Sequence, residues 1–437
     1  MALPLIGAQL LQMGNGLVDA IVAGRLGRVE LAAGGIGAAI WFFVSLLCIG
    51  LMAGLSPTLS ELIGDRRRNA VGKVFRQGLW LGVITGFIGT ISLLLMYHYL
   101  DKTALDPELI PSIRAYLITS CWSMPAMAII LAARNVCEAV NLTRPVLLVQ
   151  LLGLLVNIIV DLTLGLGLFG FPKLGMYGIG LATSAVMIVM AVVLMLLLTG
   201  KRFARYNLFA AFEAPDWTQI KPLLVLSIPI FFALVFEAGL FAATGFQSGI
   251  FGTLEASAHF IAIGATAFCY MLPLGLSFAL TARVGRVYGR RHMPGIRLRV
   301  VAGIIICIAM AVGTAILLLL FRHQITAVYT NDLAVRAFAA SLLLVSVVFQ
   351  LSDGLQAVLL GMLRGVQDTR VPMMINAFSY WAIAFGVGYL LSRNAGWGVY
   401  GLWAGLVIGL TVSSLLLGWR LKFKLNTVAK SLSSAQA

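Results

Sequence analysis

Four acidic residues stand inside stretches that are otherwise apolar, and they are the side chains of this sequence most suited to chemistry. Asp19, Asp161, Glu237 and Asp353 each interrupt a long apolar run. A charge at the centre of a membrane-spanning helix costs roughly 2.5–3.5 kcal/mol on insertion scales, so each carboxylate needs a partner or a water-filled cavity. We expect no Lys or Arg at a comparable depth. Carboxylates buried in this way ionise most easily when a cation arrives, which is the chemistry of a cation or proton relay.

Around these carboxylates, other polar residues recur at a spacing that places them on one face of a helix. Asn15 precedes Asp19 by one turn, and Asn157 precedes Asp161 in the same way. Lipid satisfies no polar group, so such a face turns towards another helix or lines a cavity. The alternative is that these polar side chains only hydrogen-bond neighbouring helices together. Phe349 either offers its ring face to a cation or packs in the core. The candidate cavity-lining residues are Gln12, Asn15, Gln150, Phe241, Thr244, Phe349 and Gln350.

Other chemistries lack their sequence signatures. Gly72-Lys73 is followed by Val74 without the glycine spacing of a P-loop, so we expect no nucleotide. The five cysteines form no C-x-x-C pair, and no H-E-x-x-H or G-x-S-x-G motif occurs. The net charge of +15 stands in short segments between apolar runs, whereas a nucleic-acid binder needs a solvated basic face. We therefore expect no cofactor, no nucleic acid and no enzyme; a membrane-embedded lipid enzyme, the alternative from that class, would need a metal or nucleophile constellation.

The elements that carry these residues are predicted to be membrane-spanning helices. Hydrophobic residues make up 60% of the 437 and charged residues 11%, against roughly 45–50% and 25% in soluble domains. A spanning helix needs about 20 mostly apolar residues. Pro57, Pro125, Pro229 and Pro273 either bend such helices or are tolerated within them. Twelve stretches qualify: 2–24, 33–57, 74–99, 112–134, 145–169, 176–199, 222–248, 256–281, 300–321, 335–362, 371–391 and 397–419.

The basic residues predict the orientation of these helices. With the amino terminus inside, 23 of the 31 Lys and Arg residues fall in the inner connections and eight in the outer ones. Cytoplasmic connections carry an excess of positive charge. Both termini are therefore expected in the cytoplasm.

An internal repeat relates the two halves of the chain at an offset of about 225 residues. At this offset Pro4 matches Pro229 and Glu30 matches Glu255. Six helices in each half give both halves the same orientation, so their pseudo-two-fold axis runs along the membrane normal. The predicted fold is an all-α polytopic membrane protein of twelve transmembrane helices in two six-helix bundles. The expected parts are an amino-terminal bundle (1–200), a cytoplasmic linker (201–221), a carboxyl-terminal bundle (222–419) and a cytoplasmic tail (420–437).

The two halves do not place their polar residues at equivalent positions. Asp19 corresponds to Thr244 at the repeat offset, and Glu237 corresponds to Gln12. The duplicated scaffold is therefore predicted to carry two different sites. One is an amino-half cluster of Asp19, Asn157 and Asp161, and the other is a carboxyl-half pair of Glu237 and Asp353.

Several of these residues resemble the multidrug and toxic compound extrusion (MATE) family. The resemblance covers essentially the whole chain. A glutamate in the seventh helix with an aspartate in the tenth is similar to the bacterial NorM-type branch and unlike the DinF-type branch. Family sequences usually carry a cytoplasmic leader ahead of the first helix, whereas here that helix begins almost at Met1, so we expect that the true start lies upstream. The resemblance rests on Val18 to Gly24, Pro145, Asn157, Asp161, Gly175, Gly178, Ala182, Thr183, Phe236-Glu237, Asp353 and Leu363-Arg364-Gly365.

The resemblance implies an inner-membrane antiporter that exports cationic amphipathic molecules, such as drugs and dyes, against H⁺ or Na⁺. It implies an amino-lobe ion site at Asp19, Asn157 and Asp161, and a carboxyl-lobe site at Glu237 and Asp353. Either site is a candidate for Na⁺, which takes several oxygen ligands, whereas H⁺ needs one carboxylate. We expect a monomer in the lipid bilayer. The alternative among transporters is a lipid-linked oligosaccharide flippase of the related superfamily, which should show a cationic cavity for pyrophosphate.

Overall fold

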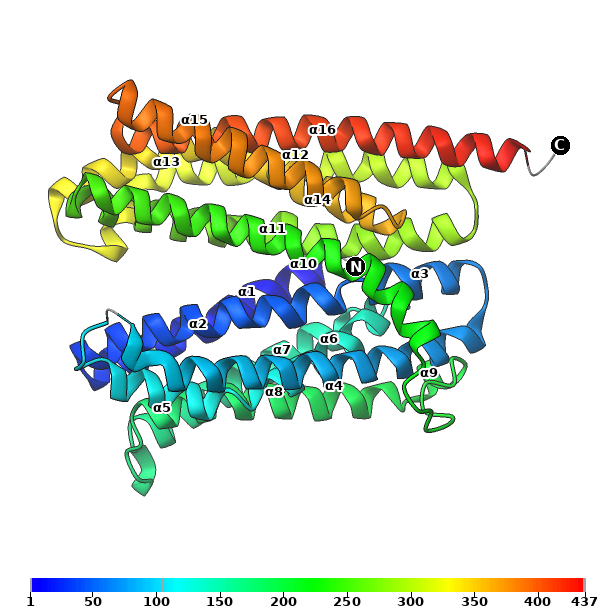
Figure 1. The fold of residues 1–437 in the computed structure, drawn as a ribbon, viewed down its shortest axis with the longest axis horizontal. Helices are drawn as coiled ribbons and strands as arrows, with labels where there is room; N and C mark the ends of the chain where they lie inside the picture. Colours follow the sequence, from blue (N-terminus) through cyan, green and yellow to red (C-terminus); the bar gives the residue numbers. More distant parts are fainter. Residues whose placement is uncertain (1, 104, 435–437) are drawn as a thin grey trace. The chain divides into compact units, whose positions relative to one another are not determined.

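The computed structural model describes residues 2–103 and 105–434, and the elements in these residues are helices (Figure 1). Within them, eleven helical stretches are long and apolar enough to cross a membrane. A further pair, Ile110–Ser120 and Ser123–Ala139, qualifies as one span bent by 45°. The predicted all-α membrane fold is therefore confirmed, with the twelve spans in the order that the apolar runs indicate.

Two compact bodies make up the chain: Leu3–Phe231, which we call the amino half, and the residues from Phe232 onwards, which we call the carboxyl half. The division falls inside the helix α10 (Trp217–Phe251). The first part of α10 therefore packs with the amino half, although the sequence assigns the whole helix to the second bundle.

The central helix of the amino half is α8, which packs against α5, α6 and α7. The end of α7 continues as one turn of π-helix, η2 (Asp161–Gly165), which begins at a predicted site residue. Such π-turns occur frequently at functional sites. The other helices are α1 (Ala2–Leu26), α2 (Arg28–Met52), α3 (Leu55–Gly64), α4 (Arg68–Tyr99), α5 (Ile110–Ser120), α6 (Ser123–Ala139), α7 (Arg144–Val160), α8 (Met176–Leu198) and α9 (Lys201–Ala204), with the short turns η1 (Leu100–Lys102) and η3 (Leu168–Gly170).

The carboxyl half is built around α13 (Leu333–Gly365), which packs against α11, α12 and α16. Its core holds the fully buried rings of Phe349, Tyr380 and Trp403. The eleventh span is interrupted twice by π-helix. The remaining elements are α11 (Thr253–Gly289), α12 (Met293–Tyr329), α14 (Arg370–Ala377), η4 (Phe378–Phe385), α15 (Gly386–Tyr389), η5 (Leu390–Asn394) and α16 (Gly398–Ser434).

Two of the four prolines singled out in the spans lie at helix breaks. Pro125 stands three residues into α6, where it removes the donor that Cys121 O would have met, and the Thr90 hydroxyl donates to that carbonyl at 2.9 Å instead. Pro57 follows the break between α2 and α3. Pro229 and Pro273 lie within continuous helices. Two of the four prolines thus coincide with helix breaks, and the other two are accommodated within α10 and α11.

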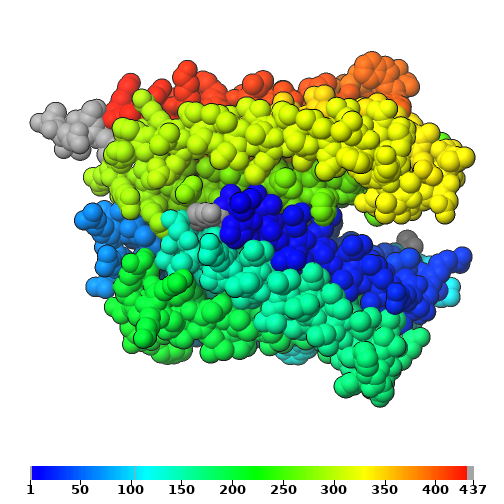
Figure 2. Space-filling view, turned by 180° about the vertical axis from the view of Figure 1, so that it is seen from behind, coloured from blue at the N-terminus to red at the C-terminus, as the bar shows by residue number. Residues whose placement is uncertain are grey.

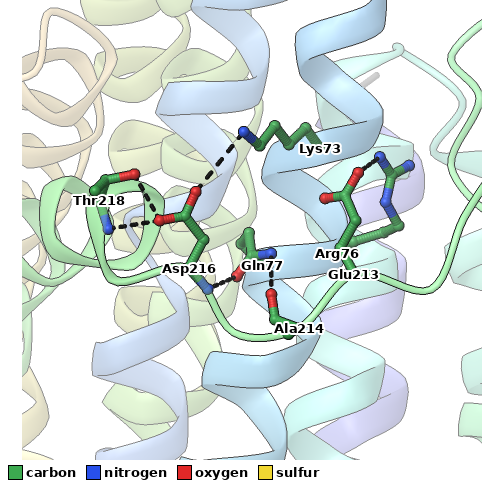
Figure 3. Close-up of polar contacts among 7 residues, drawn as sticks. All are labelled: Lys73, Arg76, Gln77, Glu213, Ala214, Asp216 and Thr218. Atoms are coloured by element: carbon green, nitrogen blue, oxygen red, sulfur yellow. Dashed lines mark hydrogen bonds and ion pairs between the residues drawn. The ribbon is translucent and has the colours of Figure 1, made fainter.

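The linker between the halves lies against the first turns of α4 (Figure 3). Arg76 Nη2 contacts Glu213 Oε1 at 2.6 Å, and Lys73 Nζ lies 3.7 Å from Asp216 Oδ2. The hydrogen bond from Arg76 holds the pKa of Glu213 below its ordinary value. The pKa of Asp216 is also lowered, first of all by the hydrogen bond that the Thr218 side chain donates to it. Both linker carboxylates are therefore ionised at neutral pH.

A buried glutamine completes this attachment. Gln77 Nε2 donates to Ala214 O at 3.0 Å, while its Oε1 accepts from Asp216 N at 2.8 Å (Figure 3). Trp80 Nε1 donates to Glu213 O at 2.7 Å. Side chains on one face of α4 thus hydrogen-bond to the backbone of the linker. We call these contacts of residues 213–216 with α4 the linker clamp.

Candidate functional site

The amino half brings its three predicted ion-site residues together. Asn157 Nδ2 donates to Asp19 Oδ1 at 2.8 Å and lies 3.4 Å from Asp161 Oδ2. Asn157 and Asp161 share one face because they stand one turn apart at the end of α7 and the start of η2. The single amide therefore bridges a carboxylate of α1 to a carboxylate of η2.

Burial leaves part of this cluster without partners. Asp161 and Asn157 are almost completely buried, while Asp19 is half-buried. Asp161 Oδ1 and Asn157 Oδ1 have no hydrogen-bond partner among the described residues. An orphaned buried oxygen costs about 1–3 kcal/mol. These two oxygens, together with the carboxylate of Asp19, fit a bound proton or a small hard cation, which takes oxygen ligands.

A tyrosine that the sequence did not single out completes the surroundings of this cluster. Tyr116 of α5 is buried, interacts with Thr183 of α8, and lies within electrostatic range of Asp19 and Asp161. No Lys or Arg among the described residues contributes to the field at Asp19 or Asp161. The sequence signal that could have identified Tyr116 is a hydroxyl-bearing aromatic side chain inside an apolar run.

The carboxyl half places Glu237 and Asp353 within electrostatic range of each other. Asp353 is buried on α13 and Glu237 is half-buried on α10. Tyr270 of α11 donates its hydroxyl to Glu237 Oε1 at 3.4 Å. Tyr380 also lies within range of both carboxylates. This second cluster is therefore a pair of carboxylates with two phenol groups, neither of which the sequence had suggested.

One expectation was wrong for this cluster, because a basic residue lies within electrostatic range of Glu237. Arg364, near the end of α13, is half-buried and interacts electrostatically with Glu237, Tyr270 and Tyr380. It stands about three turns from Asp353 on the same helix face. A long side chain can carry its charge far from its own Cα, so a position at the helix end did not exclude a charge near the site.

The predicted cavity-lining residues of the amino half differ in their surroundings. Gln12 is exposed, Asn15 is half-buried and Gln150 is buried. Asn15 Oδ1 is a buried oxygen without a partner among the described residues. Among the described residues, none of these three side chains hydrogen-bonds to Asp19 or Asp161.

Those of the carboxyl half are largely packed. Phe349 is buried edge-to-face against Phe241 and Trp403, with ring centroids 6.2 and 5.7 Å away. Gln350 Nε2 donates to Thr266 O at 2.9 Å, and Thr244 Oγ1 donates to Leu240 O at 2.8 Å. In this structure Phe349 therefore belongs to the core, and Gln350 ties α13 to α11.

The described residues contain no group of three His, Cys, Asp or Glu that could hold a metal ion. A hollow of about 460 Å³ lies between α2 and α4 and is lined by apolar residues with one serine. It touches none of the predicted site residues, so we do not connect it with ion binding.

Comparison with known proteins finds relatives that match along nearly the whole chain. The MatE family profile matches residues 4–163 and 229–390, two segments whose starts repeat the offset seen in the sequence. The probable multidrug resistance protein NorM of Xylella fastidiosa (strain Temecula1) is 37% identical over 97% of this chain and 90% of the relative. The protein of the same name from Xanthomonas axonopodis pv. citri is 38% identical over 97% and 92%. The multidrug resistance protein MdtK of Yersinia enterocolitica is 33% identical over 97% and 94%.

Solved structures share the fold at lower sequence identity. The eukaryotic MATE transporter AtDTX14 superposes with a TM-score of 0.89 over 99% of this chain and 97% of its own, at 18% identity. A MATE structure in the bent conformation gives 0.90 over 99% and 95%, at 19% identity. With a family match in both halves and relatives above 30% identity over almost its full length, the chain belongs to the MatE family, on its bacterial NorM-type branch.

Proposed function

We propose that the protein is a secondary active multidrug exporter, which moves organic cations such as dyes and antibiotics out of the cell against H⁺ or Na⁺. The observation that carries this proposal is the pair of Asp19 and Asp161, joined by the amide of Asn157. The relatives named as multidrug resistance proteins support the same function.

The cluster can hold the coupling ion in either chemical form. A proton needs only one carboxylate, and a second carboxylate nearby opposes its loss because two like charges repel. Na⁺ would use the free oxygens of Asn157 and Asp161 together with a carboxylate of Asp19. We therefore leave both ions in the proposal and separate them by experiment.

Antiport requires that ion and drug favour opposite states of the transporter. A ligand shifts a conformational equilibrium only by its difference in affinity for the two states. An ion that binds from outside would favour the state that releases drug, and a drug that binds from inside would favour the reverse. The coupling is reciprocal, so each ligand lowers the affinity for the other.

The orientation belongs to this proposal. We place the protein in the inner membrane as a monomer with both termini in the cytoplasm, because basic residues crowd the inner connections. A cysteine at exposed Asp106 should react with an impermeant reagent from outside, and one at Glu213 should not. The reverse labelling would overturn the direction of export.

The direct test is ethidium uptake into everted membrane vesicles, which corresponds to export from the cell. A Na⁺ gradient and a pH gradient are imposed separately, and we expect one of them to drive uptake. Asp106→Asn, an exposed carboxylate-to-amide change on an outer loop, should leave uptake unchanged. If neither gradient drives uptake by folded protein, the proposed function is wrong.

A further inference from the structure

The hairpin between α11 and α12 carries a cluster of arginines without acidic residues nearby in sequence. Six arginines fall within residues 283–299, and no Asp or Glu occurs between Glu255 and Asp332. The hairpin lies at the inner end of two long helices, which end at Gly289 and begin at Met293. The six are Arg283, Arg286, Arg290, Arg291, Arg297 and Arg299.

Three of these positive charges converge. Arg283 and Arg290 both lie within electrostatic range of Arg299. Arg299 Nη1 donates to Gly295 O at 2.8 Å, which fixes its side chain over the first turn of α12. Arg283 and Arg290 are exposed, and neither has an ion pair within the part of the chain that the structure describes. The start of α12 adds the partial positive charge of a helix amino terminus. This convergence calls for an anion.

The repeat-related hairpin of the amino half shows what such a cluster looks like when the chain supplies the anions. There Arg67 pairs with Asp65 at 2.8 Å, and the linker clamp brings two more carboxylates to α4. The carboxyl half has one acidic residue at its inner end, Asp368, and Arg420 Nε holds it at 2.7 Å. The described residues offer no carboxylate to Arg283 or Arg290, so we look for their anion outside the chain.

The surface beside these arginines is apolar, which selects the class of anion. On α12, Leu298 is 68% exposed, Val301 55% and Ile305 60%, and these residues follow one face of the helix. Figure 2 shows the yellow-green segment that includes α12 covering the face of the carboxyl half turned towards the reader. A ligand that meets both surfaces needs an anionic head and an acyl chain.

We propose that Arg283, Arg290 and Arg299 bind the headgroup of an anionic phospholipid, whose acyl chain lies along Leu298, Val301 and Ile305 of α12. Basic groups at the inner membrane surface attract anionic lipids at about 1 kcal/mol per residue. Cationic clusters of this kind usually only set topology, whereas this one converges on a helix terminus beside an exposed apolar face. The site is independent of the ion sites and of the transported drug.

The test is native mass spectrometry of the purified full-length protein with phosphatidylglycerol or phosphatidylcholine. We expect retention of phosphatidylglycerol over phosphatidylcholine. The triple variant Arg283→Gln, Arg290→Gln, Arg299→Gln should lose it, at about fivefold in affinity for each arginine removed. The matched control is Arg66→Gln, Arg67→Gln, Arg68→Gln, which removes the same charge from the related hairpin and should retain the lipid.

Three results would overturn the proposal. One is equal lipid loss in the two triple variants, which would indicate a general effect of surface charge. Another is equal retention of the two lipids by the parent protein. The third is thermal stabilisation by inorganic phosphate as large as that by phosphatidylglycerol, which would make the ligand a free anion. If the glutamine variant folds poorly, the matching Arg→Lys triple variant decides, because it keeps the charge and should keep the lipid.

Discussion

The two carboxylate clusters differ in what neutralises them. In the amino half, Asp19 and Asp161 meet an amide and a phenol but no basic residue among those described. In the carboxyl half, Glu237 lies within electrostatic range of Arg364 as well as of Asp353. Carboxylates without a basic neighbour can be neutralised only by a proton or cation from solution. Where an arginine lies nearby, it supplies part of the neutralising charge and would compete with an incoming cation. The two halves of the duplicated chain thus carry carboxylate clusters with different charged neighbours.

The largest effect should come from removing the open pair. Asp161→Asn deletes one of two carboxylates that share a single donor, so the remaining carboxylate of Asp19 loses the neighbouring like charge that favours retention of the ion. We expect gradient-driven ethidium uptake to fall to the passive level, a loss on the order of 5–150-fold for the coupling that one site supplies. Asp106→Asn is the control. Uptake by Asp161→Asn at the parental rate would show that the amino-half cluster does not couple transport to the ion.

The carboxyl-half carboxylates should be as necessary for transport but not for folding. Asp353→Asn and Glu237→Gln should each abolish active efflux, while the thermal midpoint of the purified protein stays at or above that of the parent. Removing a buried charge removes its desolvation cost. Folded variants that export dye at the parental rate would remove this site from the mechanism.

Arg364 sharpens the difference between the two clusters. If the carboxylates of the carboxyl half also bind the transported cation, Arg364→Gln removes a positive charge that opposes it, and the purified protein should bind ethidium about fivefold more tightly. Arg364→Lys should stay near the parent. Fluorescence titration of purified protein measures both. Arg370→Gln, at the exposed first residue of α14, is the charge-matched control. Unchanged or weaker binding in Arg364→Gln would show that the arginine does not compete.

A smaller effect is expected at the linker clamp of the amino half. Glu213→Gln should loosen the linker clamp, seen as faster hydrogen exchange in residues 207–218, with Glu108→Gln as the exposed control. The sign with pH follows from the lowered pKa of Glu213. The stabilisation is complete above the ordinary glutamate range, near pH 4.5 and higher, and is lost as pH falls through the lowered value. Equal exchange in the parent and Glu213→Gln at neutral pH would contradict the clamp.

Helix order and polar faces could be predicted from the sequence because both follow from local periodicity. Asp19 and Asp161 stand on separate helices, and the polar stripes together with the family resemblance were enough to expect them side by side. The effect of Arg364 on Glu237 could not be predicted from its position at a helix end, because a long side chain carries its guanidinium far from its own Cα. The linker clamp was missed because its partners are 137 residues apart, as for Arg76 and Glu213, and share no periodic signal.

The linker clamp also bears on the order in which the protein is made. Every partner in it, from Lys73 and Gln77 to Asp216, belongs to the part of the chain that leaves the ribosome before the carboxyl half. The first stretch of α10 behaves likewise, since Ser227 Oγ accepts from Gly54 N at 3.1 Å. The amino half can therefore form the linker clamp while the second half is still being synthesised, and the first bundle need not wait for the end of translation to be covered at this surface.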